Sequence, residues 1–319
     1  MSLPVEFDRI ARHFRPLAAA GGLGLGDDAA LLTPPAGREL VLSADALVAG
    51  VHFLTHDPPD LVARKLLRVN LSDMAAMGAE PFAYLLTVSV PRATPEAWFA
   101  AFASGLAADQ AEFGVALLGG DTTSTPGPVS LSLTIVGAVA PGQALSRAGA
   151  RAGDEIWVSG SIGDGALGLL AAQGALADPT GFLAGRYRLP RPRLALGMRL
   201  FGIASATMDV SDGLVQDLGH ICRASGVGAL LPAAAVPLSA AARAAGPERL
   251  ALCLTGGDDY ELLFTVPPER RAALLSAAAA ADLAVTRIGV CTEAAGQVIV
   301  TDAAGEPMRF LSDGWSHLG

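Results

Sequence analysis

Aspartate residues gather in six short motifs at the ends of apolar segments, and almost every motif also contains glycine or serine. The motifs are Gly26-Asp27-Asp28, Ser43-Ala44-Asp45, Leu71-Ser72-Asp73, Gly119-Gly120-Asp121, Asp209-Val210-Ser211-Asp212-Gly213 and Gly256-Gly257-Asp258-Asp259-Tyr260-Glu261. A carboxylate in apolar surroundings is costly unless a cation or a hydrogen-bond donor compensates its charge. A fold that brings these motifs together around shared cations would compensate the charge of every carboxylate. This requirement strongly limits the folds that the chain can adopt.

Each motif taken alone also has an ordinary structural interpretation. Aspartate beside glycine is a common turn former, which suits Asp27, and aspartate before a helix is a common cap, which suits Asp212. Asp45 and Asp73 are different, because they lie within a strand-like and a helix-like segment that offer their carboxylates no local backbone donor. These two residues therefore point most directly to a bound cation.

The ligand chemistry favours Mg²⁺ or Mn²⁺ over zinc, because the motifs supply hard oxygen ligands without nearby pairs of histidine or cysteine. Magnesium held by scattered carboxylates usually shares its shell with a nucleotide phosphate, and glycine lets the backbone approach phosphate oxygens closely. No Walker A motif or protein-kinase motif is present, and Lys65 is the only lysine. Phosphate charge must then be met by metal ions, backbone N–H groups and arginine. Arg147 is the best-placed arginine, since it lies near the expected domain boundary.

Composition excludes several classes of protein. The chain has 319 residues, 51% of them hydrophobic, and a net charge of −9, which argues against a nucleic-acid partner. No apolar run approaches the roughly 20 residues of a membrane span, and the charged first residues do not form a secretory signal. We therefore expect a cytoplasmic protein without a membrane partner. Cys222, Cys253 and Cys291 lie far apart and form no CxxC pair, so we expect reduced, buried thiols.

Hydrophobic periodicity predicts a mixture of helices and strands without strict alternation, which indicates a mixed α/β (α+β) fold. Helices are expected at 5–19, 58–78, 94–113, 163–175, 190–204, 212–226 and 267–282. Strands are expected at 38–48, 81–90, 115–119, 130–139, 155–159, 206–210, 259–266, 286–291 and 297–301. A segment rich in glycine, alanine and arginine precedes the strand at 155–159. We place a domain boundary there, which gives domains at 1–147 and 148–319.

Taken in order, seven segments closely resemble the thiamine-monophosphate kinase family, and together they span almost the whole chain. They are GDDAALL (26–32), SADALVAGVHF (43–53), KLLRVNLSDMAAMGAEP (65–81), GGDTT (119–123), LSRAGA (145–150), DVSDGLVQDLGH (209–220) and GGDDYELLFT (256–265). The superfamily includes aminoimidazole-ribonucleotide synthetase and selenophosphate synthetase. The resemblance implies ATP-dependent phosphorylation of thiamine monophosphate to thiamine diphosphate with several Mg²⁺ ions. It also implies a homodimer in which the N-terminal α/β domains build an intersubunit barrel, beside a C-terminal α/β sandwich domain.

The resemblance also implies roles for individual residues. The implied metal ligands are Asp28, Ser43, Asp45, Asp73, Asp121, Asp209 and Asp212. The implied ATP contacts are Gly120, Asp121, Arg147 and Ser211. The implied contacts to thiamine monophosphate are His52, Asp258 and a C-terminal aromatic, either Trp315 or Phe310. Two positions depart from the family pattern, because Ala44 stands where the family often has threonine and Asp258 where it often has glutamate.

Two other functions stay open at this point. One is an ATP-dependent enzyme like aminoimidazole-ribonucleotide synthetase, although GGDDYELLFT and LSDMAAMGAEP favour the kinase. The other is a regulatory protein that binds magnesium and nucleotide without turnover, against which the nearly complete carboxylate set argues. For the kinase we expect direct in-line transfer, without an acid–base residue and without a phosphoenzyme.

Overall fold

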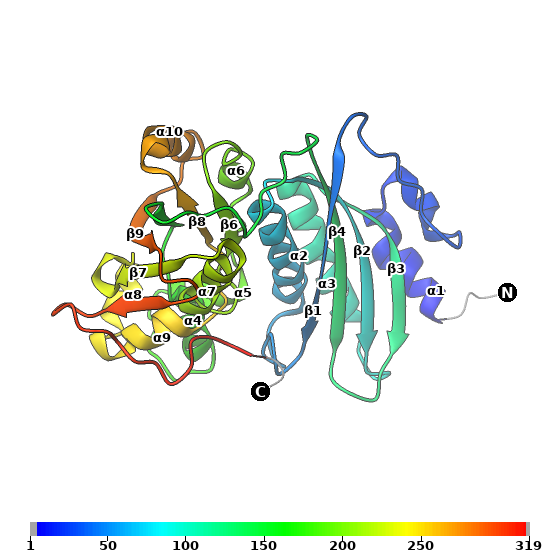
Figure 1. Cartoon of the computed structure of the whole chain (residues 1–319). Coiled ribbons are helices and arrows are strands. Elements are labelled where there is room, and N and C mark those ends of the chain that lie inside the picture. Colours follow the sequence, from blue (N-terminus) through cyan, green and yellow to red (C-terminus); the bar gives the residue numbers. More distant parts are fainter. Residues whose placement is uncertain (1–4, 317–319) are drawn as a thin grey trace. The chain divides into compact units, whose positions relative to one another are not determined.

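Residues 5–316 are described by a computed structural model, in which the chain folds into two units (Figure 1). Of these residues, 5–74 and 80–142 form unit 1, and 75–79 and 143–316 form unit 2. Each unit has its own sheet, so the expected fold of two mixed α/β domains is confirmed. The expected functional division at residue 147 stays a prediction.

Unit 1 is built on a four-stranded sheet of order β1-β4-β2-β3, with two long helices on one face (Figure 1). The elements are β1 (Glu39–Val48), α2 (Pro59–Ala76), β2 (Glu80–Val90), α3 (Glu96–Phe113), β3 (Ala116–Ser124) and β4 (Ser130–Val139). Strand β4 pairs antiparallel with β1 and β2, whereas β3 pairs parallel with β2. Side chains of β1 alternate: Val41 and Leu47 are buried, while Leu40 and Leu42 are exposed. The second face of this sheet therefore carries apolar side chains that unit 1 leaves exposed at β1.

The N-terminal segment is helical but irregular, which corrects the expected single helix at 5–19. It contains α1 (Val5–Arg9), a π-helical turn η1 (Ile10–Phe14) and the 3₁₀ turns η2 (Arg15–Leu17) and η3 (Ala20–Leu25). Pro16 lacks the N–H that a continuous helix needs, so regular helix cannot persist through it. The segment then runs along β3, where the backbone N–H of Ala19 donates to the Leu117 carbonyl at 2.9 Å.

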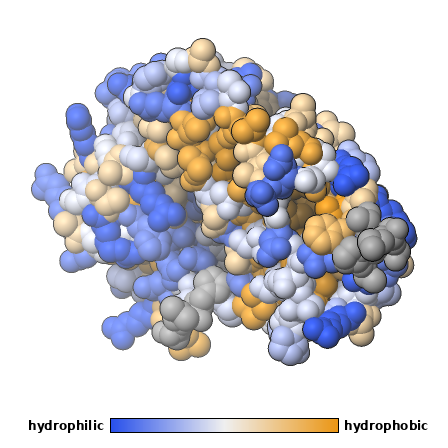
Figure 2. All heavy atoms as spheres, turned by 90° about the vertical axis from the view of Figure 1, so that its right-hand side faces the viewer, coloured by the Kyte–Doolittle hydropathy of each residue, from blue (hydrophilic) through white to orange (hydrophobic). Residues whose placement is uncertain are grey.

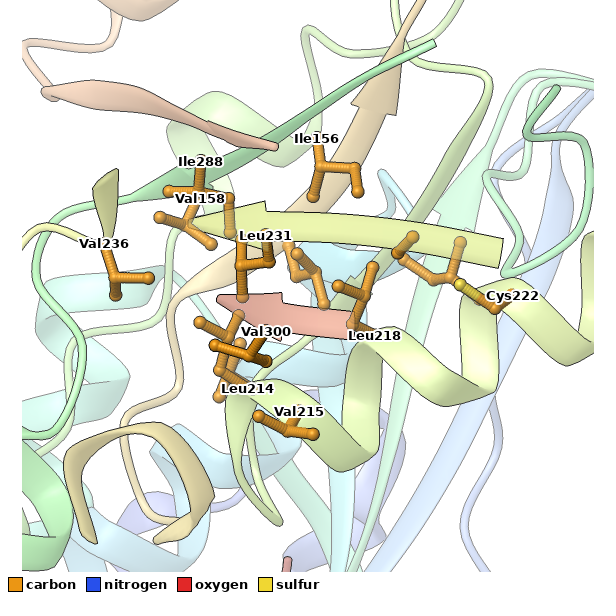
Figure 3. Packing of buried hydrophobic residues seen from close by; sticks show 14 of the residues in the cluster. Ile156, Val158, Leu214, Val215, Leu218, Cys222, Leu231, Val236, Ile288 and Val300 are labelled. Atoms are coloured by element: carbon orange, nitrogen blue, oxygen red, sulfur yellow. The ribbon is translucent and has the colours of Figure 1, made fainter. Parts of the chain in front are cut away.

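Unit 2 is built on a six-stranded sheet of order β10-β7-β9-β5-β8-β6. Its strands are β5 (Glu155–Ser159), β6 (Ala206–Asp209), β7 (Gly228–Pro232), β8 (Leu262–Val266), β9 (Val285–Thr292) and β10 (Val298–Thr301). Its helices are α4 (Asp164–Ala172), α5 (Phe182–Arg188), α6 (Leu194–Gly197), α7 (Leu214–Ser225), α8 (Ala240–Ala244), α9 (Leu250–Thr255) and α10 (Arg271–Ala280). Figure 3 shows Leu214 and Leu218 of α7 packed against Leu231 and Val300 of the sheet. This core fixes the start of α7, where the DVSDG motif lies.

Two expected elements of unit 2 are shorter in the structure. The helix expected at 190–204 is reduced to the four residues of α6. Pro190 and Pro192 explain its late start, because proline supplies no helical N–H and disfavours a helical conformation in the residue before it. The strand expected from 259 begins at Leu262, because Asp258 and Tyr260 adopt left-handed backbone angles, with φ of 69° and 52°. The chain therefore bends through the GGDDYE motif before it enters the sheet.

The three cysteines are free and buried, as expected. Among residues 5–316, no helix combines the length and the apolar character needed to cross a bilayer. A cytoplasmic location stays a prediction from the sequence.

Candidate active site

Unit 1 brings three predicted metal ligands together where β1 faces α2. Ser43 and Asp45 lie two residues apart on β1, so their side chains share one face of the sheet. The Ser43 hydroxyl donates to Oδ2 of Asp73 on α2 at 2.5 Å. The amide Oδ1 of Asn70, one turn earlier on α2, accepts from the backbone N–H of Asp45 at 3.2 Å. The helix therefore positions Asp73 and also holds the strand that carries Asp45.

The surroundings of Asp45 destabilise the ionised form of its side chain. Burial is the main cause and the nearby Asp73 carboxylate adds to it, and together they raise the pKa of Asp45 to about 6. Two carboxylates and a hydroxyl are hard oxygen donors, which are the ligands that Mg²⁺ prefers. A divalent cation would relieve both the repulsion and the desolvation, so the residues present fit the metal that the sequence predicts.

We expect Asp45→Asn to stabilise the protein at neutral pH when divalent cations are absent. The pKa of Asp45 in the folded state lies above its unfolded value of about 3.9, so ionisation favours unfolding as pH rises from about 4 to about 6. The variant should gain on the order of 2–3 kcal/mol at pH 7.5, and only about 0.5 kcal/mol at pH 4. Urea denaturation with EDTA at both pH values measures this. Equal stability of the two proteins at pH 7.5 would show that Asp45 carries no such cost.

Lys65 and His52 connect α2 to the loop after β1 in unit 1. The Lys65 ammonium is buried on α2 and donates to the backbone carbonyl of His52 at 3.0 Å. The backbone N–H of Val48 donates to Nδ1 of His52 at 3.0 Å, which assigns the ring proton of a neutral imidazole to Nε2. The only lysine of the chain therefore fixes the loop that carries His52, a role that the sequence did not indicate.

A second group of predicted ligands lines a cavity of about 660 Å³ within unit 1. Asp28 and Asp121 belong to its wall, together with Gly120 and apolar side chains of the N-terminal segment and the sheet. Gly120 has a φ of 154°, and a Cβ at this position would lie 1.7 Å from the Leu86 carbonyl oxygen on β2. Only glycine fits here, because the backbone of β2 passes so close to β3 at this position. Asp27 behaves as the expected turn residue, because its carboxylate accepts from the N–H of Asp28 at 2.9 Å.

In unit 2, the DVSDG loop is organised by a carboxylate that the sequence analysis did not single out. Oδ2 of Asp217 on α7 accepts from the backbone N–H groups of Ser211, Asp212 and Gly213 at 3.0, 3.1 and 3.1 Å. Burial, and then repulsion by Asp212, raise the pKa of Asp217 to about 7, although these three donors oppose the shift. Gly213 occupies the N-cap position of α7 without a side-chain cap, so the expected capping role of Asp212 is wrong. The side chain of Asp212 is thereby available for another function.

The GGDDYE loop packs directly on the DVSDG loop. The backbone N–H of Asp258 donates to the Ser211 carbonyl at 2.9 Å, and a Cβ on Gly257 would lie 2.1 Å from that same oxygen. The next residue, Asp259, is fully buried and accepts from the N–H groups of Gly163 and Gly165 at 2.7 and 2.9 Å. Burial raises the pKa of Asp259 to about 8. The predicted ATP contact Ser211 and the predicted substrate contact Asp258 are therefore neighbours.

Arg147 approaches the same region of unit 2 from the loop before β5. Its carbonyl accepts from the Ser225 hydroxyl at 3.2 Å, which anchors the loop to the end of α7. Burial lowers the pKa of His220 on α7, and the guanidinium groups of Arg223 and Arg147 lower it further. Two guanidinium groups therefore act on the His220 imidazole, while the nearby Asp212 carboxylate opposes their effect on its pKa.

A cavity of about 840 Å³ in unit 2 runs along α7 and the C-terminal segment. Its wall includes Asp212, Gln216, Phe310 and Trp315, so both candidate aromatics line the same cavity. The backbone N–H of Trp315 donates to the Asp212 carbonyl at 2.9 Å, and the Trp315 side chain is 52% exposed. This cavity combines a predicted metal ligand with an aromatic surface.

The predicted site residues therefore form three groups. Ser43, Asp45 and Asp73 meet between β1 and α2, and Asp28, Gly120 and Asp121 line the cavity of unit 1. The group in unit 2 joins residues of the DVSDG, GGDDYE and C-terminal segments: Asp209, Ser211, Asp212, Asp258 and Trp315. Among the histidine, cysteine, aspartate and glutamate side chains of residues 5–316, three ligand atoms lie within 4.8 Å of one another only at Asp212, Asp217 and His220.

Two family models match the chain and together cover most of it. The AIR synthase related protein N-terminal domain matches residues 26–139, and the AIR synthase related protein C-terminal domain matches residues 151–302. The curated thiamine-monophosphate kinase of Caulobacter vibrioides is 47% identical over 98% of this chain and 91% of its own length. This chain belongs to the thiamine-monophosphate kinase family. The Escherichia coli K12 thiamine-monophosphate kinase is 43% identical over 97% of this chain and 94% of its own length.

Solved structures of this kinase family share the fold. Thiamine-monophosphate kinase from Stenotrophomonas maltophilia K279a superposes with a TM-score of 0.83 and 45% identity, over 94% of this chain and 96% of that one. AaThiL complexed with AMPPCP and TMP superposes with a TM-score of 0.77 and 28% identity, over 99% of this chain and 100% of that one. The resemblance read from the sequence motifs is thus confirmed at the level of the family and its fold.

Proposed function

We propose that this chain transfers the terminal phosphoryl group of ATP to thiamine monophosphate, which yields thiamine diphosphate. The observation that carries the proposal is the Ser43–Asp45–Asp73 cluster, a set of hard oxygen donors whose raised Asp45 pKa calls for a cation. The family supports the same reaction, since relatives at 43–47% identity are thiamine-monophosphate kinases and AaThiL was solved with AMPPCP and TMP.

We assign roles within this reaction as follows. Metal binding is assigned to Asp28, Ser43, Asp45, Asp73, Asp121, Asp209 and Asp212. Contacts to ATP are assigned to Gly120, Asp121, Arg147 and Ser211, and contacts to thiamine monophosphate to His52, Asp258 and Trp315. Residues 1–147 would then form the domain that binds ATP and magnesium and makes the dimer, and residues 148–319 would form the C-terminal α/β domain.

The chemistry requires positioning more than proton transfer. The attacking group is a phosphate oxygen of thiamine monophosphate, which is already ionised near neutral pH, so a strong general base is unnecessary. The main obstacle is repulsion between two anions that approach each other in line. Bound Mg²⁺ would supply the positive charge that screens this repulsion and stabilises the transferred phosphoryl group. The carboxylates would hold that charge, Gly120 would contact ATP through its backbone, and Arg147 would contribute a guanidinium.

The deciding experiment is an assay with ATP, Mg²⁺ and thiamine monophosphate. We expect thiamine diphosphate to form in a Mg²⁺-dependent manner, and no labelled protein to be trapped from γ-labelled ATP. Turnover of formylglycinamidine ribonucleotide instead would show that the chain is an aminoimidazole-ribonucleotide synthetase. Nucleotide binding without turnover of either substrate would favour the regulatory alternative. A covalent phosphoprotein would exclude direct transfer.

We also propose that the chain forms a homodimer through the exposed face of the unit 1 sheet. Leu42 and Leu85 on this sheet are 63% and 42% exposed, and Leu40 of β1 is also exposed. Figure 2 shows apolar side chains gathered over a broad area on the side that lies to the right in Figure 1. Large exposed apolar patches mark protein interfaces. Sedimentation equilibrium should give twice the 32.3 kDa of one chain, whereas a monomer at micromolar concentration would refute this assembly.

A further inference from the structure

We infer that Gln216 is a positioning residue for substrate binding, because it ties the C-terminal segment 310–316 to the loop that carries Asp212. The inference rests on the proposed function, in which Asp212 holds a metal and Trp315 contacts thiamine monophosphate. Gln216 itself has no assigned role, and it lies on α7 one turn after Asp212.

The amide group of Gln216 connects these two parts directly. Its Nε2 donates to Oδ2 of Asp212 at 3.1 Å and to the carbonyl oxygen of Trp315 at 2.8 Å. The backbone N–H of Trp315 completes the connection, since it donates to the Asp212 carbonyl at 2.9 Å. One side chain therefore orients the carboxylate of a predicted metal ligand and the backbone of a predicted substrate contact.

The C-terminal segment also passes over Gln216 at van der Waals distance. A Cβ on Gly314 would lie 2.5 Å from Cβ of Gln216 and 2.7 Å from its Oε1, so a larger residue at 314 would push the segment away. The Ser312 hydroxyl donates to the Gly314 carbonyl at 2.6 Å, which supports the turn in this conformation. The segment can therefore lie this close to the Gln216 side chain only because residue 314 is glycine.

Hydrogen bonds, more than burial, hold Trp315 in place. Its side chain is 52% exposed, so packing alone does not fix it. The indole lines the unit 2 cavity together with Asp212 and Gln216, and this geometry depends on the backbone hydrogen bonds at 315. Because Gln216 touches the carboxylate and the segment at once, its loss should weaken substrate binding more than the chemical step.

The test compares Gln216→Met with Gln173→Met, which makes the same change at an exposed residue after α4. Methionine keeps the size of the side chain and removes the amide donor. We expect Gln216→Met to raise KM for thiamine monophosphate about tenfold, since two hydrogen bonds are lost, with kcat and KM for ATP changed less than about threefold. Gly314→Ala should produce the same shift with Gln216 intact, and Gln173→Met should leave all three constants unchanged.

Hydrogen–deuterium exchange of the 310–316 segment is the second readout, and it does not require any activity. We expect faster exchange at the Trp315 amide in Gln216→Met and Gly314→Ala, at an unchanged melting temperature. Unchanged exchange and unchanged KM in Gln216→Met would overturn the inference. An equal loss of kcat and of affinity for both substrates would also overturn it, because such a loss would indicate a general structural role. If the wild-type protein forms no thiamine diphosphate, the proposed function fails, whereas the exchange result still decides whether Gln216 holds the segment.

Discussion

Replacing Asp73 by asparagine is expected to reduce Mg²⁺-dependent phosphoryl transfer at least about 100-fold while the protein stays folded. Asparagine has the same shape and keeps an oxygen that can accept from the Ser43 hydroxyl, which now donates to Asp73 Oδ2 at 2.5 Å. The lost negative charge is what a divalent cation requires. The substitution also removes the repulsion that contributes to the raised pKa of Asp45, so the pKa of Asp45 should fall.

The measurement is initial rate against Mg²⁺ concentration, together with the urea midpoint of each protein. Asp60→Asn is the matched control, because Asp60 lies in the first turn of the same helix and outside the predicted ligand set. That change should cost at most about 1 kcal/mol of helix stability and leave the rate unchanged. Near-normal activity of Asp73→Asn at low Mg²⁺ would remove Asp73 from the metal site.

Glu261→Gln is expected to cost about 3–5 kcal/mol of stability, the largest effect on folding that we predict. The Glu261 side chain is fully buried at the start of β8, and Arg186 donates to its Oε1 at 3.0 Å. Arg193 donates to both carboxylate oxygens, at 2.6 Å to Oε2, and the Ser159 hydroxyl also donates to Oε2 at 2.6 Å. A neutral amide leaves two buried or half-buried guanidinium groups without their negative partner.

Chemical denaturation of the full chain tests this, with intrinsic tryptophan fluorescence as the probe. Trp157 contributes to that signal and is buried on the neighbouring strand β5. Glu269→Gln is the control, because Glu269 is an exposed residue in the 3₁₀ turn before α10. If Glu261→Gln lowers the free energy of unfolding by less than about 1 kcal/mol, the contacts of Glu261 with the two arginines are solvated and contribute no more than a surface ion pair.

The sequence predicted the parts of the site that depend on local pattern. Alternation along β1 places Ser43 and Asp45 on one face, and the helical pattern at 58–78 places Asp73 within a helix. That this helix brings Asp73 to Ser43 is seen only in the structure. Most strands and long helices follow from the same periodicity. The family resemblance supplied roles that no local pattern contains, such as those of His52 and Trp315.

Features that depend on contacts between distant segments could not be predicted in this way. Asp217 looks like an ordinary polar position on α7, yet it organises the DVSDG loop through three backbone N–H groups. Gln216 gains its contacts only because residues 314 and 315 return to the start of α7. Glu261 within GGDDYE reads as part of a site motif, but its partners Arg186 and Arg193 come from a region where prolines interrupt the helical pattern.

The buried position of Lys65 also bears on how this protein can be regulated. Acetylation and methylation of lysine need an accessible ε-amino group, and the only one that the sequence provides is 2% exposed and bound to the His52 carbonyl. While the fold is intact, lysine modification therefore has no target side chain. Covalent control of this chain has to act on other residue types, and an unexpectedly modified Lys65 would report that α2 had opened.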